Sequence, residues 1–128
     1  MPSDDLRFAR THEWVKAAGD VARVGISDFA VKELTDLVYI ELPTVGRTIA
    51  GGEAFGEVES VKAVSDLYAP VSGTVVAVNK DLPGNLQWLS DDPFGMGWVA
   101  EIRMSSPADI KALMSAAEYA KFCESEKH

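Results

Sequence analysis

The feature that most limits how this chain can fold is its series of short β-favouring runs, each closed by a glycine or proline turn. Residues 21–26 and 37–42 are two such runs, and Pro43 ends the second. Gly46, Gly51 and Gly52 then divide the next part of the chain into short segments. This spacing favours a small β-sandwich or barrel over alternating strands and helices. We therefore expect a mainly β fold.

The first part of the chain predicts a hairpin followed by a short helix. β-favouring residues at 13–16 and 21–26 flank a turn at 18–20, as in two antiparallel strands. The hydroxyl of Ser27 can accept a hydrogen bond from an unpaired N–H at a helix start. We expect Ser27 to cap a helix that ends at about Leu34.

The last part predicts one more strand and two short helices that lie on the sandwich. Residues 97–103 alternate well enough for a strand. Ser106 and Pro107 then resemble a cap followed by proline at the first helical position. Ser115 and Glu118 have the spacing of a capping box.

Two segments resemble each other and lie on either side of Lys62. Residues 43–49 and 70–76 each begin with proline and have glycine at the same offset. We interpret them as a weak internal repeat of two strand-turn-strand halves. A chance match is the alternative, because this proline-glycine spacing is common in turns.

Length and composition indicate one domain over residues 1–128, with a core over about 6–104 and a helical segment over about 106–125. The chain has 128 residues, of which 47% are hydrophobic, and no apolar stretch of membrane-spanning length. A net charge of −8 argues against nucleic-acid or anionic membrane surfaces and favours partners with basic docking surfaces. The first residues resemble neither a secretory signal nor a transit peptide. We expect a bacterial cytoplasmic location, or the mitochondrial matrix for a trimmed eukaryotic form.

The residues around Lys62 point to a reactive lysine. β-compatible residues run up to Lys62 and away from it, which places it at the exposed tip of a tight hairpin. An acylating enzyme could reach an amine held there on a rigid scaffold. An ordinary solvated lysine would give the same pattern, since exposed lysine is common. Cys123 is the single cysteine, so the chain itself offers no dithiol couple, and we expect Cys123 to be a packing residue.

Several motifs occur in a characteristic order along the chain. One consists of Glu59, Ser60, Val61, Lys62 and Ala63, followed by residues 69–73. It resembles the lysine attachment region of the glycine cleavage H-protein family. Further matches are residues 11–15, 24–28, 38–43 and 92–98, in the family's order. Biotinyl domains normally place the modified lysine between two methionines, whereas this lysine lies between Val61 and Ala63. Thr35, Phe29 and Leu86 depart from the family's pattern, which affects loop geometry more than the attachment lysine.

The resemblance implies a barrel-sandwich hybrid that carries lipoate covalently on Lys62, beside Glu59, Ser60, Val61 and Ala63. Such a protein is a non-catalytic carrier, expected as a monomer. It would shuttle an aminomethyl group from glycine decarboxylase (P protein) to an aminomethyltransferase (T protein), with reoxidation by dihydrolipoyl dehydrogenase (L protein). A lipoyl or octanoyl transferase, or a lipoate ligase, would attach the cofactor.

The family's pattern also suggests Glu13 and Asp66 as carboxylates that hold the cationic aminomethyl amine. A solvent-facing Glu13 and a turn-capping Asp66 are the alternatives. His12 could be a base, but a packed or solvent-facing histidine fits better because no nucleophile stands near it in a recognisable pattern. We expect Trp14, Trp88 and Trp98 to line the core or a groove.

Three other functions remain open on the sequence alone. The chain could be a lipoyl or biotinyl module of a larger multienzyme chain, although no Ala/Pro-rich linker is present. It could be a relay protein that supplies lipoate to 2-oxoacid dehydrogenase complexes. An enzyme is the weakest hypothesis, because the sequence has no metal-ligand cluster, phosphate-binding loop or nucleophile-base motif.

Overall fold

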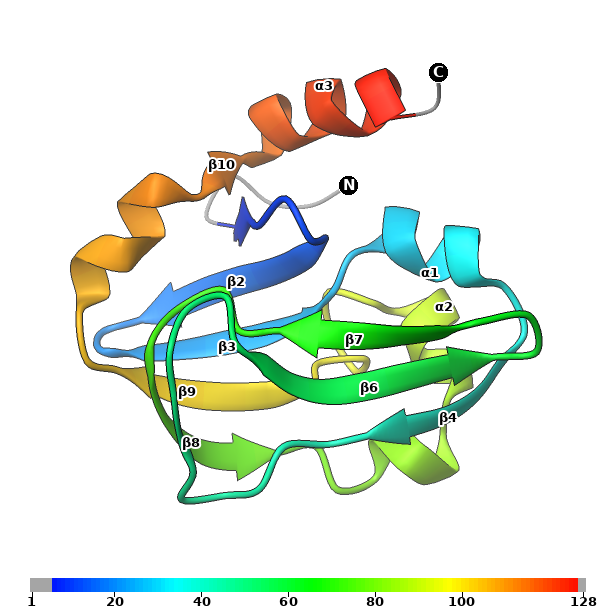
Figure 1. Ribbon diagram of the computed structural model, residues 1–128, viewed down its shortest axis with the longest axis horizontal. Helices are drawn as coiled ribbons and strands as arrows, with labels where there is room; N and C mark the ends of the chain where they lie inside the picture. The colour runs from blue at the N-terminus through cyan, green and yellow to red at the C-terminus, as the bar shows by residue number, and fades with distance from the viewer. Residues whose placement is uncertain (1–5, 127–128) are drawn as a thin grey trace.

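The computed structural model, which describes residues 6–126, is built around two antiparallel sheets (Figure 1). The larger sheet contains, in spatial order, β10 (Met114–Ser115), β1 (Leu6–Phe8), β2 (Glu13–Ala18), β3 (Val21–Ile26), β9 (Ala100–Met104), β8 (Gly73–Val78) and β5 (Thr48–Ile49). The smaller sheet contains β4 (Leu37–Glu41), β6 (Ala54–Ser60) and β7 (Val64–Tyr68). The expected mainly β barrel-sandwich hybrid is confirmed.

Short helices surround the sheets. They are α1 (Asp28–Leu34), the 3₁₀ helix η1 (Leu82–Gly84), α2 (Gln87–Asp91), the 3₁₀ helix η2 (Pro107–Ala112) and α3 (Ala116–Glu126). Figure 1 shows α3 beside β1 and β10, on the opposite side of the molecule from β4. Among the helices of residues 6–126, none is long and apolar enough to cross a membrane.

Buried apolar side chains form two clusters. The larger cluster lies between the sheets and includes Val24, Ile40, Val58, Val75 and Ile102, each almost without exposed surface. The smaller cluster is formed by Leu6, Phe8, Trp14, Tyr119 and Cys123, and it fixes α3 to the larger sheet. The rings of Phe8 and Tyr119 are stacked with centroids 4.3 Å apart. Cys123 is therefore a buried packing residue, as expected.

The N-terminal hairpin and helix follow the sequence prediction. β2 and β3 pair along their length, and Gly19 in the turn has φ +65°, a conformation that glycine adopts without strain. Ser27 caps α1, because its hydroxyl accepts a hydrogen bond from the N–H of Ala30 at 3.2 Å. Both elements depend on contacts between residues close in sequence.

The last strand and the helix after it differ from the prediction. β9 begins at Ala100 rather than Gly97. The amide of Asn79 donates to the carbonyls of Met96 and Trp98 at 2.8 and 2.9 Å, which holds the preceding residues in a loop. The first of the two expected short helices is the 3₁₀ helix η2, which begins at Pro107 as predicted, but Ser106 makes no side-chain cap to it.

The second expected C-terminal helix is present as α3. Ser115 and Glu118 form the predicted capping box: the Ser115 N–H donates to the Glu118 carboxylate at 2.9 Å, and the Glu118 N–H donates to the Ser115 hydroxyl at 3.2 Å. The box satisfies backbone N–H groups that the first helical turn leaves unpaired.

The two segments that resemble each other lie side by side. β5 pairs antiparallel with β8, with Thr48 opposite Thr74. The Gly46 N–H donates to the Val75 carbonyl at 2.7 Å, and the Val75 N–H donates to the Arg47 carbonyl at 2.9 Å. The segments on either side of the Lys62 hairpin therefore hold each other in place.

Candidate functional site

Lys62 lies in the short loop that joins β6 to β7. The paired strands end at Glu59 and Val64. The Ser60 N–H then donates to the Ala63 carbonyl at 2.8 Å, and the Ala63 N–H donates to the Ser60 hydroxyl at 3.1 Å. These bonds close the turn, and Lys62 between them is exposed. The sequence prediction of an accessible lysine at a hairpin tip is confirmed.

The connection between α1 and β4 supports this tip. The Val61 N–H donates to the Asp36 carbonyl at 3.1 Å, and Leu37 pairs with Ser60. Thr35 and Asp36 have φ of +51° and +25°, values that are uncommon for residues with a side chain. The backbone is therefore bent sharply where it braces the Lys62 loop.

The neighbours of Lys62 divide into turn-forming and surface residues. Ser60 is buried and Ala63 accepts its N–H, so both shape the turn. Val61 is 75% exposed. Glu59 lies within β6, opposite Tyr39 on one side and Val64 on the other.

Glu13 is a buried carboxylate at the start of β2, with only 3% of its surface exposed. One oxygen accepts the Tyr68 N–H at 3.1 Å, and the other accepts the hydroxyl of Thr11. Burial raises the pKa of Glu13 from 4.5 to about 7, although the bonds from Thr11 and Tyr68 act in the opposite direction. The alternative of a solvent-facing Glu13 is wrong.

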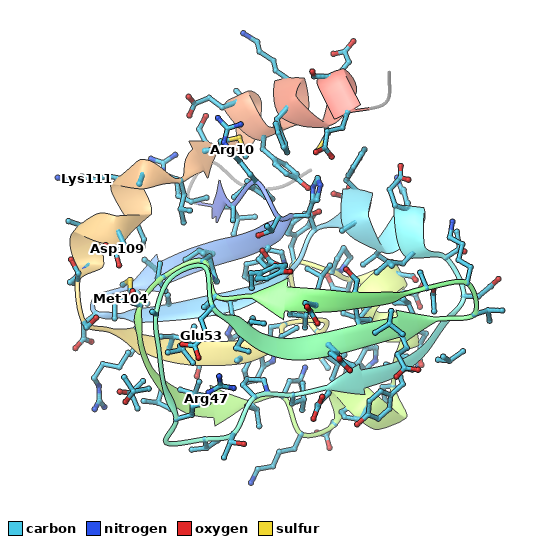
Figure 2. The ribbon with its side chains drawn as sticks, in the orientation of Figure 1. Arg10, Arg47, Glu53, Met104, Asp109 and Lys111 are labelled. Atoms are coloured by element: carbon cyan, nitrogen blue, oxygen red, sulfur yellow. The ribbon has the colours of Figure 1, made fainter. Side chains whose placement is uncertain are left out.

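Asp66 lies in the middle of β7, so the alternative that it caps a turn is wrong. It is exposed and stands opposite Glu57, which stands opposite Glu41. These three residues line a hollow of about 260 Å³ that Arg47 also borders. Arg47 is paired with Glu53 at 2.8 Å, and Figure 2 shows these two side chains near each other.

The structure brings Glu13 to β7 but not to Asp66 itself. Glu13 binds the backbone of Tyr68, two residues beyond Asp66 on the same strand. Sequence reasoning missed the Thr11 hydroxyl that binds Glu13. The sequence signal that could have revealed this bond is a hydroxyl side chain two positions before the acid.

His12 joins the turn before β2 to α3. Its Nδ1 lies 2.7 Å from the Tyr119 hydroxyl, and its Nε2 lies 2.9 Å from a carboxylate oxygen of Glu126. The Tyr119 hydroxyl also contacts the Ser27 hydroxyl at 2.5 Å, and burial is the main reason that its pKa is raised. The interpretation of His12 as a packed histidine is confirmed. Tyr119 was missed because it is 107 positions from His12.

The three tryptophans are core or near-core residues, as expected. Trp14 is fully buried and donates from its indole N–H to the Pro93 carbonyl at 2.9 Å. Trp88 and Trp98 pack in part against the two apolar clusters. Across residues 6–126, no three His, Cys, Asp or Glu side chains are grouped so as to hold a metal ion.

A two-sheet sandwich with a lysine at the closed tip of a hairpin defines the class of the protein: a barrel-sandwich hybrid of the lipoyl-domain type. The model of one family, described as "Glycine cleavage H-protein", matches residues 6–126. The chain therefore belongs to the glycine cleavage H-protein family and to the proteins of glycine catabolism.

Similar proteins agree with this family. The glycine cleavage system H protein of Carboxydothermus hydrogenoformans is 49% identical over 95% of this chain and 94% of its own length. That of Rhodopirellula baltica is 57% identical over 92% of both chains. The crystal structure of an H protein from Mycobacterium marinum superposes with a TM-score of 0.86 at 40% identity, covering 94% of this chain and 97% of the other.

Proposed function

We propose that this chain is a non-catalytic carrier of the glycine cleavage system that bears lipoate on Lys62. In this role it receives an aminomethyl group from glycine decarboxylase and delivers it to the aminomethyltransferase, and dihydrolipoyl dehydrogenase then reoxidises it. A lipoyl or octanoyl transferase, or a lipoate ligase, loads Lys62. Because the similar H proteins come from bacteria, we place these steps in the bacterial cytoplasm.

The observation that carries the proposal is the closed turn around Lys62. The bonds between Ser60 and Ala63 hold the backbone on both sides of the lysine, while the lysine itself is exposed. An enzyme can therefore engage the amine without unfolding the hairpin. The rigid tip also limits the directions in which a long arm can extend.

The residues near Lys62 fit a lipoyl group. Acylation removes the lysine charge, so the arm can lie against apolar surface without burying an ammonium. Val61 provides such surface beside the tip. When bound, the lipoyl group supplies the thiol-disulfide chemistry that a chain with one cysteine lacks.

Glu13 and Asp66 are proposed to hold the amine of the carried group. Asp66 offers an exposed carboxylate in the hollow on the outer face of β6 and β7. Glu13 offers a carboxylate fixed by two donors at the end of β7. A cationic amine beside Glu13 would favour the ionised form of this acid, because opposite charges lower the pKa of a carboxyl group.

Intact mass spectrometry with peptide mapping tests the attachment. The protein is co-expressed with a lipoate ligase and supplied with lipoic acid. We expect a lipoyl-sized increase on the peptide that contains Lys62 and none in Lys62→Arg. Lys80→Arg, a second exposed lysine, is the matched control and keeps the increase. A biotin-sized increase, or none in the unaltered chain, would show that the proposal is wrong.

The proposed role of the acids is tested by the loss of the aminomethyl group from loaded protein. We expect Glu13→Gln and Asp66→Asn to accelerate this loss by about tenfold each, since each removes a charge-assisted hydrogen bond. Glu124→Gln, on the exposed side of α3, is the control. Decay at the unaltered rate in both test variants would exclude these residues from the role.

A further inference from the structure

Exposed apolar side chains are concentrated around the Lys62 tip. Within residues 6–126, six large hydrophobic residues are exposed, and four of them belong to the tip or to the strands beside it. These four, which we name the tip patch, are Val38, Tyr39, Val61 and Val64. Scattered exposed apolar residues need no explanation, but a contiguous group of them marks an interaction surface.

The strand register shows how the residues of the patch are arranged. Tyr39 stands opposite Glu59, and Glu59 stands opposite Val64, so the three side chains share the outer face of the smaller sheet. The pairing of β4 with β6 is irregular between Leu37 and Tyr39. As a result, both Val38 and Tyr39 are exposed, at 53% and 47%.

Carboxylates border the patch. Glu41, Glu57 and Asp66 form the next row of the same face. Like charges placed opposite each other destabilise a sheet, and none of the ion pairs found in residues 6–126 involves these three acids. The surface beside Lys62 therefore combines exposed apolar side chains with carboxylates, one of which, Glu59, lies between Tyr39 and Val64. Such a surface complements a cleft with apolar walls and basic residues.

We propose that the tip patch is the docking surface for the enzyme that acylates Lys62. This inference rests on the proposed function, because it assumes that Lys62 is the attachment site. Acylation requires the lysine amine itself to enter the enzyme's active site, so the residues next to the lysine must touch that enzyme. The enzymes that use the loaded arm act on the sulfur atoms at its far end, whereas the attaching enzyme acts on the lysine amine at the hairpin tip itself. The patch therefore suits the attaching enzyme.

Initial rates of lipoylation test the assignment. Apo protein, purified lipoate ligase, ATP and lipoate are combined, and the product is followed by intact mass. We expect the double variant Tyr39→Ser/Val64→Ser to lower kcat/KM by about tenfold. The effect is a higher KM with little change in kcat, because the substitutions remove binding and leave the reacting amine unaltered.

Matched controls separate docking from folding. Val45→Ser removes a valine that is 51% exposed but lies in the turn before β5, beside the larger sheet. We expect this variant to be lipoylated at the unaltered rate. Thermal unfolding checks that the exposed substitutions leave the fold intact. Binding of the ligase to each variant is also measured directly, in chains that carry Lys62→Arg so that no turnover occurs. We expect the affinities to follow the same order as the rates.

The outcomes are distinct from failure of the proposed function. If the unaltered chain gains no lipoyl group, the attachment proposal fails. If the unaltered chain is modified and Tyr39→Ser/Val64→Ser is modified equally fast, only the docking surface is overturned. Fully lipoylated variants are then compared as substrates of glycine decarboxylase, where we expect an unchanged KM. An equal loss at both enzymes would overturn the assignment to the attaching enzyme.

Discussion

Glu13 is a single residue whose ionisation opposes folding. Burial raises its pKa from 4.5 to about 7, so the folded chain binds a proton that the unfolded chain releases between these two pH values. Protonated Glu13 therefore contributes to the free energy of unfolding. This contribution is fully present below about pH 4.5 and is lost as the pH rises through 7. Between about pH 5 and 8 this loss amounts to roughly 2 to 3 kcal/mol of unfolding free energy.

Replacement of Glu13 by glutamine should remove this pH dependence. Urea unfolding at about pH 5 and about pH 8 gives the two free energies for each variant. We expect the difference in Glu13→Gln to be smaller than in the unaltered chain by roughly 2 kcal/mol. Glu124→Gln should keep the original difference, because Glu124 is exposed. An unchanged difference in Glu13→Gln would contradict the raised pKa.

Thr35 is strained at its φ of +51° and ψ of 171°, a region that glycine occupies far more readily. Thr35→Gly should therefore raise the free energy of unfolding by about 1 kcal/mol, even though glycine also makes the unfolded chain more flexible. Thermal unfolding measures the gain. Thr44→Gly, at a position without positive φ, should give no gain. A lower Tm for Thr35→Gly would show that the strain is not relieved.

At the scale of an element, the β6–β7 hairpin depends on the Ser60 hydroxyl that accepts the Ala63 N–H. Ser60→Ala should loosen the turn and lower the initial rate of lipoylation about threefold to tenfold, while Ser60→Thr keeps the hydroxyl and restores most of the rate. Ser65→Ala, in the same hairpin, is the control. Full activity of Ser60→Ala would mean that turn rigidity is unimportant for attachment.

The attachment of α3 depends on the Tyr119 hydroxyl, which contacts both His12 and Ser27. Tyr119→Phe keeps the ring stacked on Phe8 but leaves these polar groups with fewer partners, so it should destabilise the fold by about 1 to 3 kcal/mol. Tyr39→Phe removes an exposed hydroxyl and should change little. Chemical unfolding of both variants measures the difference, and equal stabilities would show that the contacts of Tyr119 are not stabilising.

For the whole molecule, the net charge of −8 should attract basic partners at long range. Lipoylation kcat/KM should fall about tenfold as the ionic strength rises from low to several hundred millimolar, because salt screens exposed charges. Glu41→Gln/Glu57→Gln should flatten this dependence more than Glu101→Gln/Glu124→Gln, which removes the same charge elsewhere. Equal slopes for the two double variants would show that only net charge matters.

Local features were predictable from the sequence by itself. The Lys62 turn, the Ser27 cap and the Ser115–Glu118 box each depend on groups that lie within three positions of one another. The strand-turn pattern likewise indicated the mainly β fold. The same reasoning failed at Ser106, where a cap and proline led to a 3₁₀ helix without the cap bond.

Only the tertiary structure decided what depends on distant residues. Glu13 is buried against the backbone of a residue 55 positions away, so its raised pKa has no signal in the residues next to it. The rows of apolar and acidic side chains beside Lys62 likewise depend on the register of three strands. A sequence pattern determines local turns and caps because their partners are near in the chain. Burial and strand register depend on how the sheets pack, which the local pattern does not contain.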